Sequence, residues 1–140
     1  MKKKLKLGLI GVLLLFFSCN KKEEINTLKI GEVTEIKIGE TVENSHLGLL
    51  LRVESVNDSR CPIGVVCAWQ GIVYVNFHLT TKTSEYSFTL DGMYGMYPYP
   101  PFVGQDTIIE GIKYQLTDVL PYPDISDMEA KKTVKILVGN

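Results

Sequence analysis

Apolar and polar side chains alternate in short runs through most of the chain after residue 27. In the run 73–80, Val73, Val75 and Phe77 alternate with Tyr74 and Asn76. A period of two is typical of β-strands that bury one face. The pattern predicts strands at residues 33–38, 47–54, 73–80, 86–90, 112–117 and 134–138.

Turn-forming dipeptides separate these runs. The predicted turns are Gly39-Glu40, Asn57-Asp58, Asp91-Gly92 and Glu110-Gly111. Residues 125–132 are the best candidate for helix, and we expect one turn there at most. About seven or eight short strands indicate an all-β fold. We expect a single antiparallel β-sandwich, Ig-like or similar, with a small barrel as the alternative.

The N-terminus has the pattern of an export signal. Lysines at positions 2, 3, 4 and 6 precede an apolar run at residues 7–17. This run is too short to span a bilayer as a helix, which takes about 20 residues. A charged segment followed by a short apolar segment is typical of a secretory signal peptide.

The end of the apolar run, Ser18-Cys19, resembles the lipobox of bacterial lipoproteins. The resemblance implies cleavage before Cys19, a diacylglycerol on its thiol and an acyl chain such as palmitate on its amine. Several acyl chains anchor a protein stably to a membrane. We therefore expect a signal peptide at 1–18, a lipid-anchored tether at 19–27 and the β-sandwich domain at 28–140.

The residues after Cys19 bear on location and charge. Lys22-Glu23-Glu24 resembles the surface-export signal of Bacteroidota lipoproteins, which implies an outer-membrane protein that faces outward; the alternative is a solvated linker. Removal of residues 1–18 leaves 11 Lys+Arg against 16 Asp+Glu, a net charge of −5. This balance gives no electrostatic argument for a nucleic-acid partner. It also gives no attraction to anionic lipid.

The remaining cysteines predict a disulfide. With Cys19 lipidated, Cys61 and Cys67 are left, and an exported protein meets an oxidising compartment. Five residues separate the two, which suits neither a C-x-x-C redox site nor a four-ligand zinc site. Closing so small a ring stabilises by roughly 2 kcal/mol.

The segment around this pair reads D-S-R-C-P-I-G-V-V-C-A-W-Q-G from Asp58 to Gly71. We expect Asp58 and Arg60 to pair across the turn, and Pro62 to help bend the loop. Trp69 is predicted to pack over the disulfide at the edge of the core and to begin the next strand. Gly71 is predicted to permit a close approach or a bulge.

The pattern D-S-R-C-P-x-x-V-x-C-x-W-x-G resembles a motif of small secreted or lipid-anchored bacterial proteins, many of them from the Bacteroidota. The late segment L-T-D-V-L-P at 116–121 extends the resemblance. It implies no particular activity.

Residues 93–102 form a Pro-rich aromatic segment that excludes a central strand. Its aromatic residues Tyr94, Tyr97, Tyr99 and Phe102 are the candidate binding loop, because tyrosine offers contact area at low entropy cost. The favoured interpretation is that they fold back over an open end of the core, since exposed apolar patches are rare.

Catalytic and metal-binding motifs are absent from the sequence. We expect no catalytic residue and no cofactor. The weak metal candidates are His46 in a turn, His78 on an outer strand face, and Met93 and Met96, which are soft ligands suited to copper. The simpler interpretation is exposed histidines and gap-filling methionines.

These observations together predict a lipid-anchored cell-envelope protein with a non-catalytic binding or structural accessory role. Its membrane contact is the lipid, and its partner is an unidentified protein, glycan or small ligand. The alternatives are a copper-binding envelope protein that uses methionine and histidine ligands, and an envelope enzyme whose site is assembled from distant strands.

Overall fold

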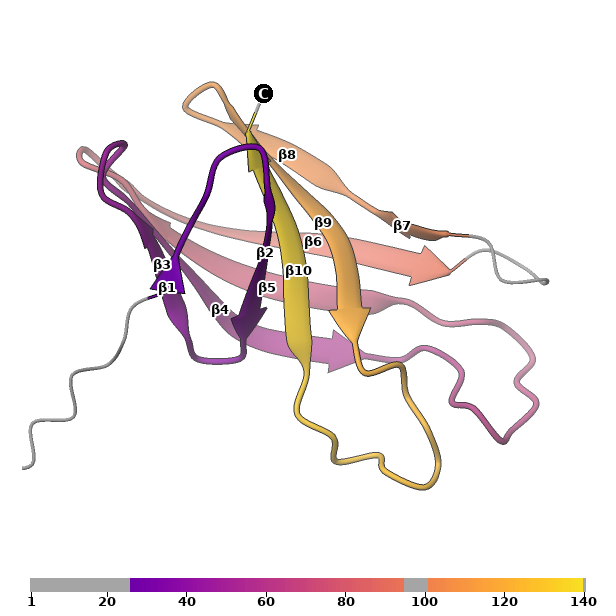
Figure 1. Ribbon diagram of the computed structural model, residues 1–140. Helices are drawn as coiled ribbons and strands as arrows, with labels where there is room; N and C mark the ends of the chain where they lie inside the picture. The colour runs from indigo at the N-terminus through magenta and orange to yellow at the C-terminus, as the bar shows by residue number, and fades with distance from the viewer. Residues whose placement is uncertain (1–25, 95–100, 140) are drawn as a thin grey trace, which may run out of the picture.

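The computed structural model describes residues 26–94 and 101–139, and within them every regular element is a strand. The all-β prediction is therefore confirmed (Figure 1). The strands are β1 (Asn26–Thr27), β2 (Val33–Lys37), β3 (Thr41–Asn44), β4 (Leu49–Asp58), β5 (Val73–Thr80), β6 (Glu85–Tyr94), β7 (Phe102–Gly104), β8 (Asp106–Ile109), β9 (Ile112–Leu120) and β10 (Thr133–Gly139).

These strands form two sheets packed as a sandwich (Figure 1). The larger sheet has the order β1-β3-β4-β5-β6-β7, and the smaller has the order β2-β10-β9-β8. In the described residues the short β1 pairs with β3 in parallel, and the other ladders are antiparallel. The described strands number ten, more than expected, because β1, β3, β7 and β8, which lie outside the predicted ranges, are too short to show an alternating pattern.

The core lies between the sheets and uses the alternate positions that the sequence pattern marked. On β5 the inward side chains are Val73, Val75, Phe77 and Leu79, each fully buried. Phe77 stacks on Phe88 of β6 with ring centroids 5.2 Å apart. Burial of one face of each strand is what holds the two sheets together.

One long side of the sandwich is closed by β7 and β8, which form a nearly continuous segment that changes sheets at Gln105. The Gln105 amide donates to the carbonyl of Asp91 on β6, at 2.7 Å. Its own carbonyl accepts the Leu116 amide of β9, at 3.0 Å. A Cβ on Gly104 would lie 1.9 Å from the carbonyl oxygen of Leu116, so glycine is required at this corner.

Two of the predicted turns are wrong. Asn57 and Asp58 are the last residues of β4, and Asp91-Gly92 lies inside β6. Gly92 is needed for packing, because a Cβ there would lie 2.1 Å from Cζ of the Phe102 ring. A glycine inside a strand often marks such a close approach rather than a turn.

The turn at Glu110-Gly111 is confirmed. Both residues have positive φ angles, 50° and 80°, as a type I′ hairpin requires. One carboxylate oxygen of Glu110 accepts the hydroxyls of Thr81, Thr83 and Tyr86, at 3.2, 3.2 and 2.9 Å. These bonds tie the β8–β9 hairpin to the β5–β6 hairpin.

The predicted turn of helix at 125–132 is also wrong. The segment forms two successive turns instead, in which Asp127 N donates to Asp124 O and Ala130 N donates to Asp127 O, at 3.1 and 3.3 Å. Leu47, expected in a strand, lies in the β3–β4 turn.

In the described part of the chain, no helix has the length and apolar character needed to cross a membrane.

Candidate functional site

Two long loops meet at one end of the sandwich (Figure 1). The first joins β4 to β5 and contains the disulfide; residues 59–72 are called the cysteine loop here. The second, residues 121–132, joins β9 to β10. The Ile63 amide donates to the Pro123 carbonyl at 2.9 Å, and the Ile125 amide donates back to the Ile63 carbonyl at 3.3 Å. These bonds join the two loops into one surface.

The cysteine loop is held at its base by covalent and backbone bonds. Cys61 and Cys67 form the predicted disulfide, with their Cα atoms 5.9 Å apart. The Cys61 amide donates to the Gln70 carbonyl at 2.7 Å. Gly71 has a φ of +73°, and a Cβ there would lie 1.9 Å from the Ser59 carbonyl oxygen. The predicted close approach at Gly71 is thus present.

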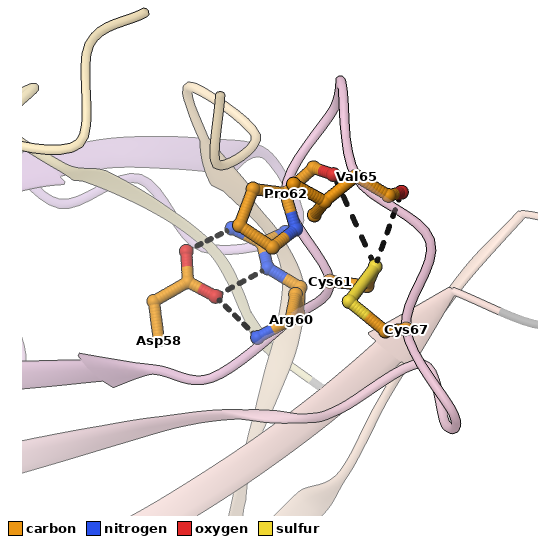
Figure 2. The surroundings of a disulfide bond; sticks show 6 residues. All are labelled: Asp58, Arg60, Cys61, Pro62, Val65 and Cys67. Carbon is orange, nitrogen blue, oxygen red and sulfur yellow. Dashed lines mark hydrogen bonds and ion pairs between the residues drawn. A yellow bond between two sulfur atoms is a disulfide. The ribbon is translucent and has the colours of Figure 1, made fainter. Parts of the chain in front are cut away.

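Arg60 and Asp58 form the predicted pair beneath this loop (Figure 2). Arg60 Nε donates to Asp58 Oδ1 at 2.7 Å, and Nη2 donates to Oδ2 at 2.6 Å. Nη2 also donates to the carbonyl of Val119 on β9, at 2.9 Å. Arg60 is only 2% exposed, so this guanidinium joins the two sheets from inside the molecule.

Aromatic rings and a lysine complete an arginine cluster, defined as Asp58, Arg60, Tyr94, Tyr122 and Lys132. The guanidinium carbon lies 5.7 Å from the ring centroid of Tyr94 and 4.8 Å from that of Tyr122, within cation–π range. Lys132 Nζ lies 3.2 Å from Asp58 Oδ2 and donates to the Pro121 carbonyl at 2.8 Å. The cluster therefore attaches both loops to the body of the sandwich.

The electrostatics of this cluster favour fixed charges. Burial alone would raise the pKa of Asp58, but hydrogen bonds and charge from Arg60, with a bond from Lys132, hold that pKa below its ordinary value. Burial raises the pKa of Tyr94 to about 12, and the bond from its hydroxyl to Asp118 adds to the effect. Neither group changes protonation near neutral pH, so the cluster serves to position the loops.

Above the cluster, apolar side chains of both loops are exposed to solvent. We call this set the apolar tip; its members are Ile63 (58% exposed), Val65 (46%), Val66 (102%), Trp69 (70%), Ile125 (55%) and Met128 (58%). Residues 63–70 are all exposed, and residues 61–70 contain no charged side chain. Several large apolar side chains exposed together on two joined loops are unusual on a soluble domain and commonly mark an interaction site.

The predicted position of Trp69 is wrong. Its indole was expected to pack over the disulfide at the edge of the core, yet it is 70% exposed, and the next strand begins only at Val73. Arg60 and the rings of Tyr94 and Tyr122 occupy the end of the core. The indole of Trp69 lies outside this group, exposed to solvent.

The candidate aromatic binding loop is only partly described. Tyr94 and Phe102 are half-buried, and their rings meet edge to face with centroids 5.3 Å apart. Phe102 packs against the core, in the direction of the favoured interpretation, while Tyr94 contacts the rings of Phe102 and Tyr122 beside Arg60. Tyr97 and Tyr99 lie outside the described residues.

The weak metal candidates are not brought together where they are described. His46 lies in the exposed β3–β4 turn, while His78 on β5 faces Ser87 and Glu85 of β6, with Nδ1 3.3 Å from the Ser87 hydroxyl. Met93 lies at the other end of β6, and Met96 falls outside the described residues. Across residues 26–94 and 101–139, no three His, Cys, Asp or Glu side chains gather as a metal site would require.

Sequence reasoning missed three residues around the buried arginine, Asp118, Tyr122 and Lys132. It also missed the exposed apolar side chains of the tip at Ile63, Val66, Ile125 and Met128. Asp118 lies within the segment at 116–121 that extended the family resemblance, and Tyr122 follows it directly between two prolines. That segment was the available signal. The pairing of Lys132 with Asp58 joins residues 74 positions apart, and no sequence pattern marks it.

No protein-family model, curated protein or solved structure matches this chain. The class of molecule is therefore defined by its own fold and site. It is an all-β sandwich with a disulfide-closed loop mounted on a buried arginine.

Proposed function

We propose that this protein is a lipid-anchored, non-catalytic binding module of the bacterial cell envelope, and that its contact surface is the apolar tip. The observation that carries the proposal is the exposure of Trp69 and Val66 on a loop held by a disulfide and a buried ion pair. Interface energy concentrates in anchors of this kind, with tryptophan among the most enriched. A loop already held in shape loses little entropy on binding.

The first described residue of the chain and the cysteine loop lie at opposite ends of the larger sheet. Asn26, the first described residue, pairs with Val42, which pairs with Leu51 near the start of β4. The cysteine loop leaves the far end of β4, after Asp58. Leu51 and Asp58 are seven residue steps apart along β4, or roughly 23 Å at 3.3 Å per residue. A chain held through Cys19 can therefore present its tip away from the membrane.

The anchoring part of the proposal is tested by Cys19→Ala. We expect the wild type to incorporate radiolabelled palmitate and to sediment with outer membranes, and the variant to lose both properties. Protease treatment of intact cells should remove the domain while a periplasmic marker survives. Equal palmitate labelling of the two chains would refute lipidation at Cys19, and protection in intact cells would refute an outward-facing domain.

The binding part is tested by site-specific photo-crosslinking in producing cells. A photoreactive phenylalanine analogue replaces Val66 in the full chain, and a matched control places it at Ile108, which is 70% exposed on β8. We expect a discrete crosslinked species from position 66 and none from position 108. The same products from both positions, or none from position 66, would overturn the assignment of the tip as the contact surface.

A further inference from the structure

Acidic side chains border the apolar tip on one side. Asp124, Asp127 and Glu129 alternate with tip residues Ile125 and Met128 along the β9–β10 loop. Asp127 and Glu129 are exposed, and no ion pair joins either of them to another described residue. Hydrogen bonds from Ser126 hold the pKa of Asp124 below its ordinary value. We call these three carboxylates the acidic rim.

The cations of the same loop do not cancel this charge. Lys132 is turned inward, with Nζ bound to Asp58 and to the Pro121 carbonyl. Lys131 is exposed and is the remaining cation of residues 121–132. The cysteine-loop part of the tip lies within residues 61–70, which carry no charge. The docking surface thus combines an apolar centre with one negative border.

We propose that the apolar tip docks into an apolar groove of a partner protein, and that basic side chains of that groove meet the acidic rim. This inference rests on the proposed binding function. The two joined loops extend beyond the ends of the strands (Figure 1). A protruding apolar surface needs a concave apolar partner to exclude water, and opposite charge at the border sets orientation and speeds encounter.

The same features disfavour the other occupants of such a surface. An acidic rim is repelled by anionic lipid headgroups. A two-fold pairing of two copies through this surface offers the acidic rim no basic border, because residues 61–70 are uncharged. A glycan presents mostly hydroxyl groups, and the aliphatic side chains of Ile63, Val65 and Val66 offer these groups no hydrogen-bond partner.

The test combines the crosslinker at position 66 with charge reversal, in the full chain in producing cells. Asp127→Lys with Glu129→Lys reverses the rim. The matched control, Glu32→Lys with Glu54→Lys, makes the same charge change at exposed positions away from the tip. We expect the rim reversal to reduce the crosslinked species by about tenfold and the control to leave it within about twofold. Thermal unfolding checks that both variants fold.

Mass spectrometry of the crosslinked product decides the partner's chemistry. We expect a peptide of another protein, taken from an apolar groove with Lys or Arg at its border. Reversing those basic residues to Glu should restore crosslinking to the Asp127→Lys, Glu129→Lys variant. A lipid, a glycan or a second copy of this chain in the product would overturn the inference, as would crosslinking that rim reversal leaves unchanged. In these cases the binding function stands. If position 66 of the wild type gives no crosslinked product at all, the binding function itself is refuted.

Discussion

The guanidinium of Arg60 donates hydrogen bonds to both carboxylate oxygens of Asp58, two residues earlier in the chain. The Arg60 side chain is 1% exposed and that of Asp58 is 7% exposed. A bidentate arginine–carboxylate pair fixes direction as well as distance. Here the pair fixes the point where the chain leaves β4 and enters the cysteine loop. The apolar tip is therefore mounted on a buried ionic contact.

Arg60→Leu should lower the free energy of unfolding by about 3–5 kcal/mol, because it leaves the Asp58 charge buried with Lys132 alone. The double variant Arg60→Leu, Asp58→Asn should be less destabilised than Arg60→Leu. Urea unfolding of the four chains of this cycle measures the coupling. Strictly additive losses would show that the pair is not energetically coupled.

The Asp58 pair should also make stability depend on acid pH. The pKa of Asp58 is lower in the folded chain than its ordinary value. The stabilisation is thus fully present above that ordinary value, about 3.9, and is lost as pH falls through the folded pKa. Asp58→Asn should be less stable than the wild type at pH 7, and the difference should shrink below about pH 4. A constant difference from pH 7 to pH 3 would contradict this.

Tyr114→Phe should stabilise the protein or leave it unchanged, by 0 to about 1 kcal/mol. Tyr114 is fully buried, and its hydroxyl has no hydrogen-bond partner among the described residues. Tyr94→Phe is the contrasting variant, because its hydroxyl donates to Asp118 at 2.6 Å; it should destabilise by about 1–3 kcal/mol. Thermal unfolding measures the stability of both variants. A Tyr114→Phe variant less stable than Tyr94→Phe would contradict the assignment of the Tyr114 hydroxyl as buried without a hydrogen bond.

The dependence of stability on pH above pH 10 offers a second test of Tyr114. Burial, with a smaller contribution from Glu110, raises its pKa to about 12. The stabilisation of the neutral phenol is present below the unfolded pKa of about 10 and is lost as pH rises toward 12. Stability of Tyr114→Phe should therefore fall less between pH 10 and 12 than that of the wild type. Parallel curves would show that Tyr114 does not titrate on unfolding.

Removal of the disulfide by Cys61→Ser with Cys67→Ser should cost roughly 2 kcal/mol, because the ring is small. The sandwich should still fold, since its core lies between the sheets and away from the loop. Urea unfolding gives the loss, and partial proteolysis should find new cleavage within residues 61–70. A completely unfolded variant would mean that the loop contributes far more than a local constraint.

Two glycines with nearly equal φ angles allow the cost of backbone strain to be measured separately from the cost of a steric clash. Gly111→Ala has φ +80° and no atom within 4 Å of the new Cβ, so it should cost about 1–2 kcal/mol. Gly71→Ala adds a backbone clash with Ser59 and should cost clearly more. Chemical unfolding of the two variants measures the difference. Equal losses would mean that the cysteine loop can shift to make room.

The alternating pattern was enough to predict an all-β sandwich and most of its long strands, because burial of one sheet face leaves a period of two in the residues themselves. Cys61 and Cys67 were likewise readable as a pair, since their spacing and the predicted export signal constrain their chemistry locally. The type I′ turn at Glu110-Gly111 depends on backbone preferences of adjacent residues. Each of these features is encoded over a few positions of the chain.

Only the tertiary structure decided how residues are arranged at the end of the sandwich where the cysteine loop meets the β9–β10 loop. Whether Trp69 points inward depends on which groups already fill the end of the core, and these come from Arg60, Tyr94 and Tyr122 on three separate segments. Gly92 looked like a turn residue because the ring that covers it, Phe102, follows ten positions later. Contacts between distant segments leave no periodic trace in a single sequence, so the position of the apolar tip and its acidic rim emerged only when the sheets were assembled.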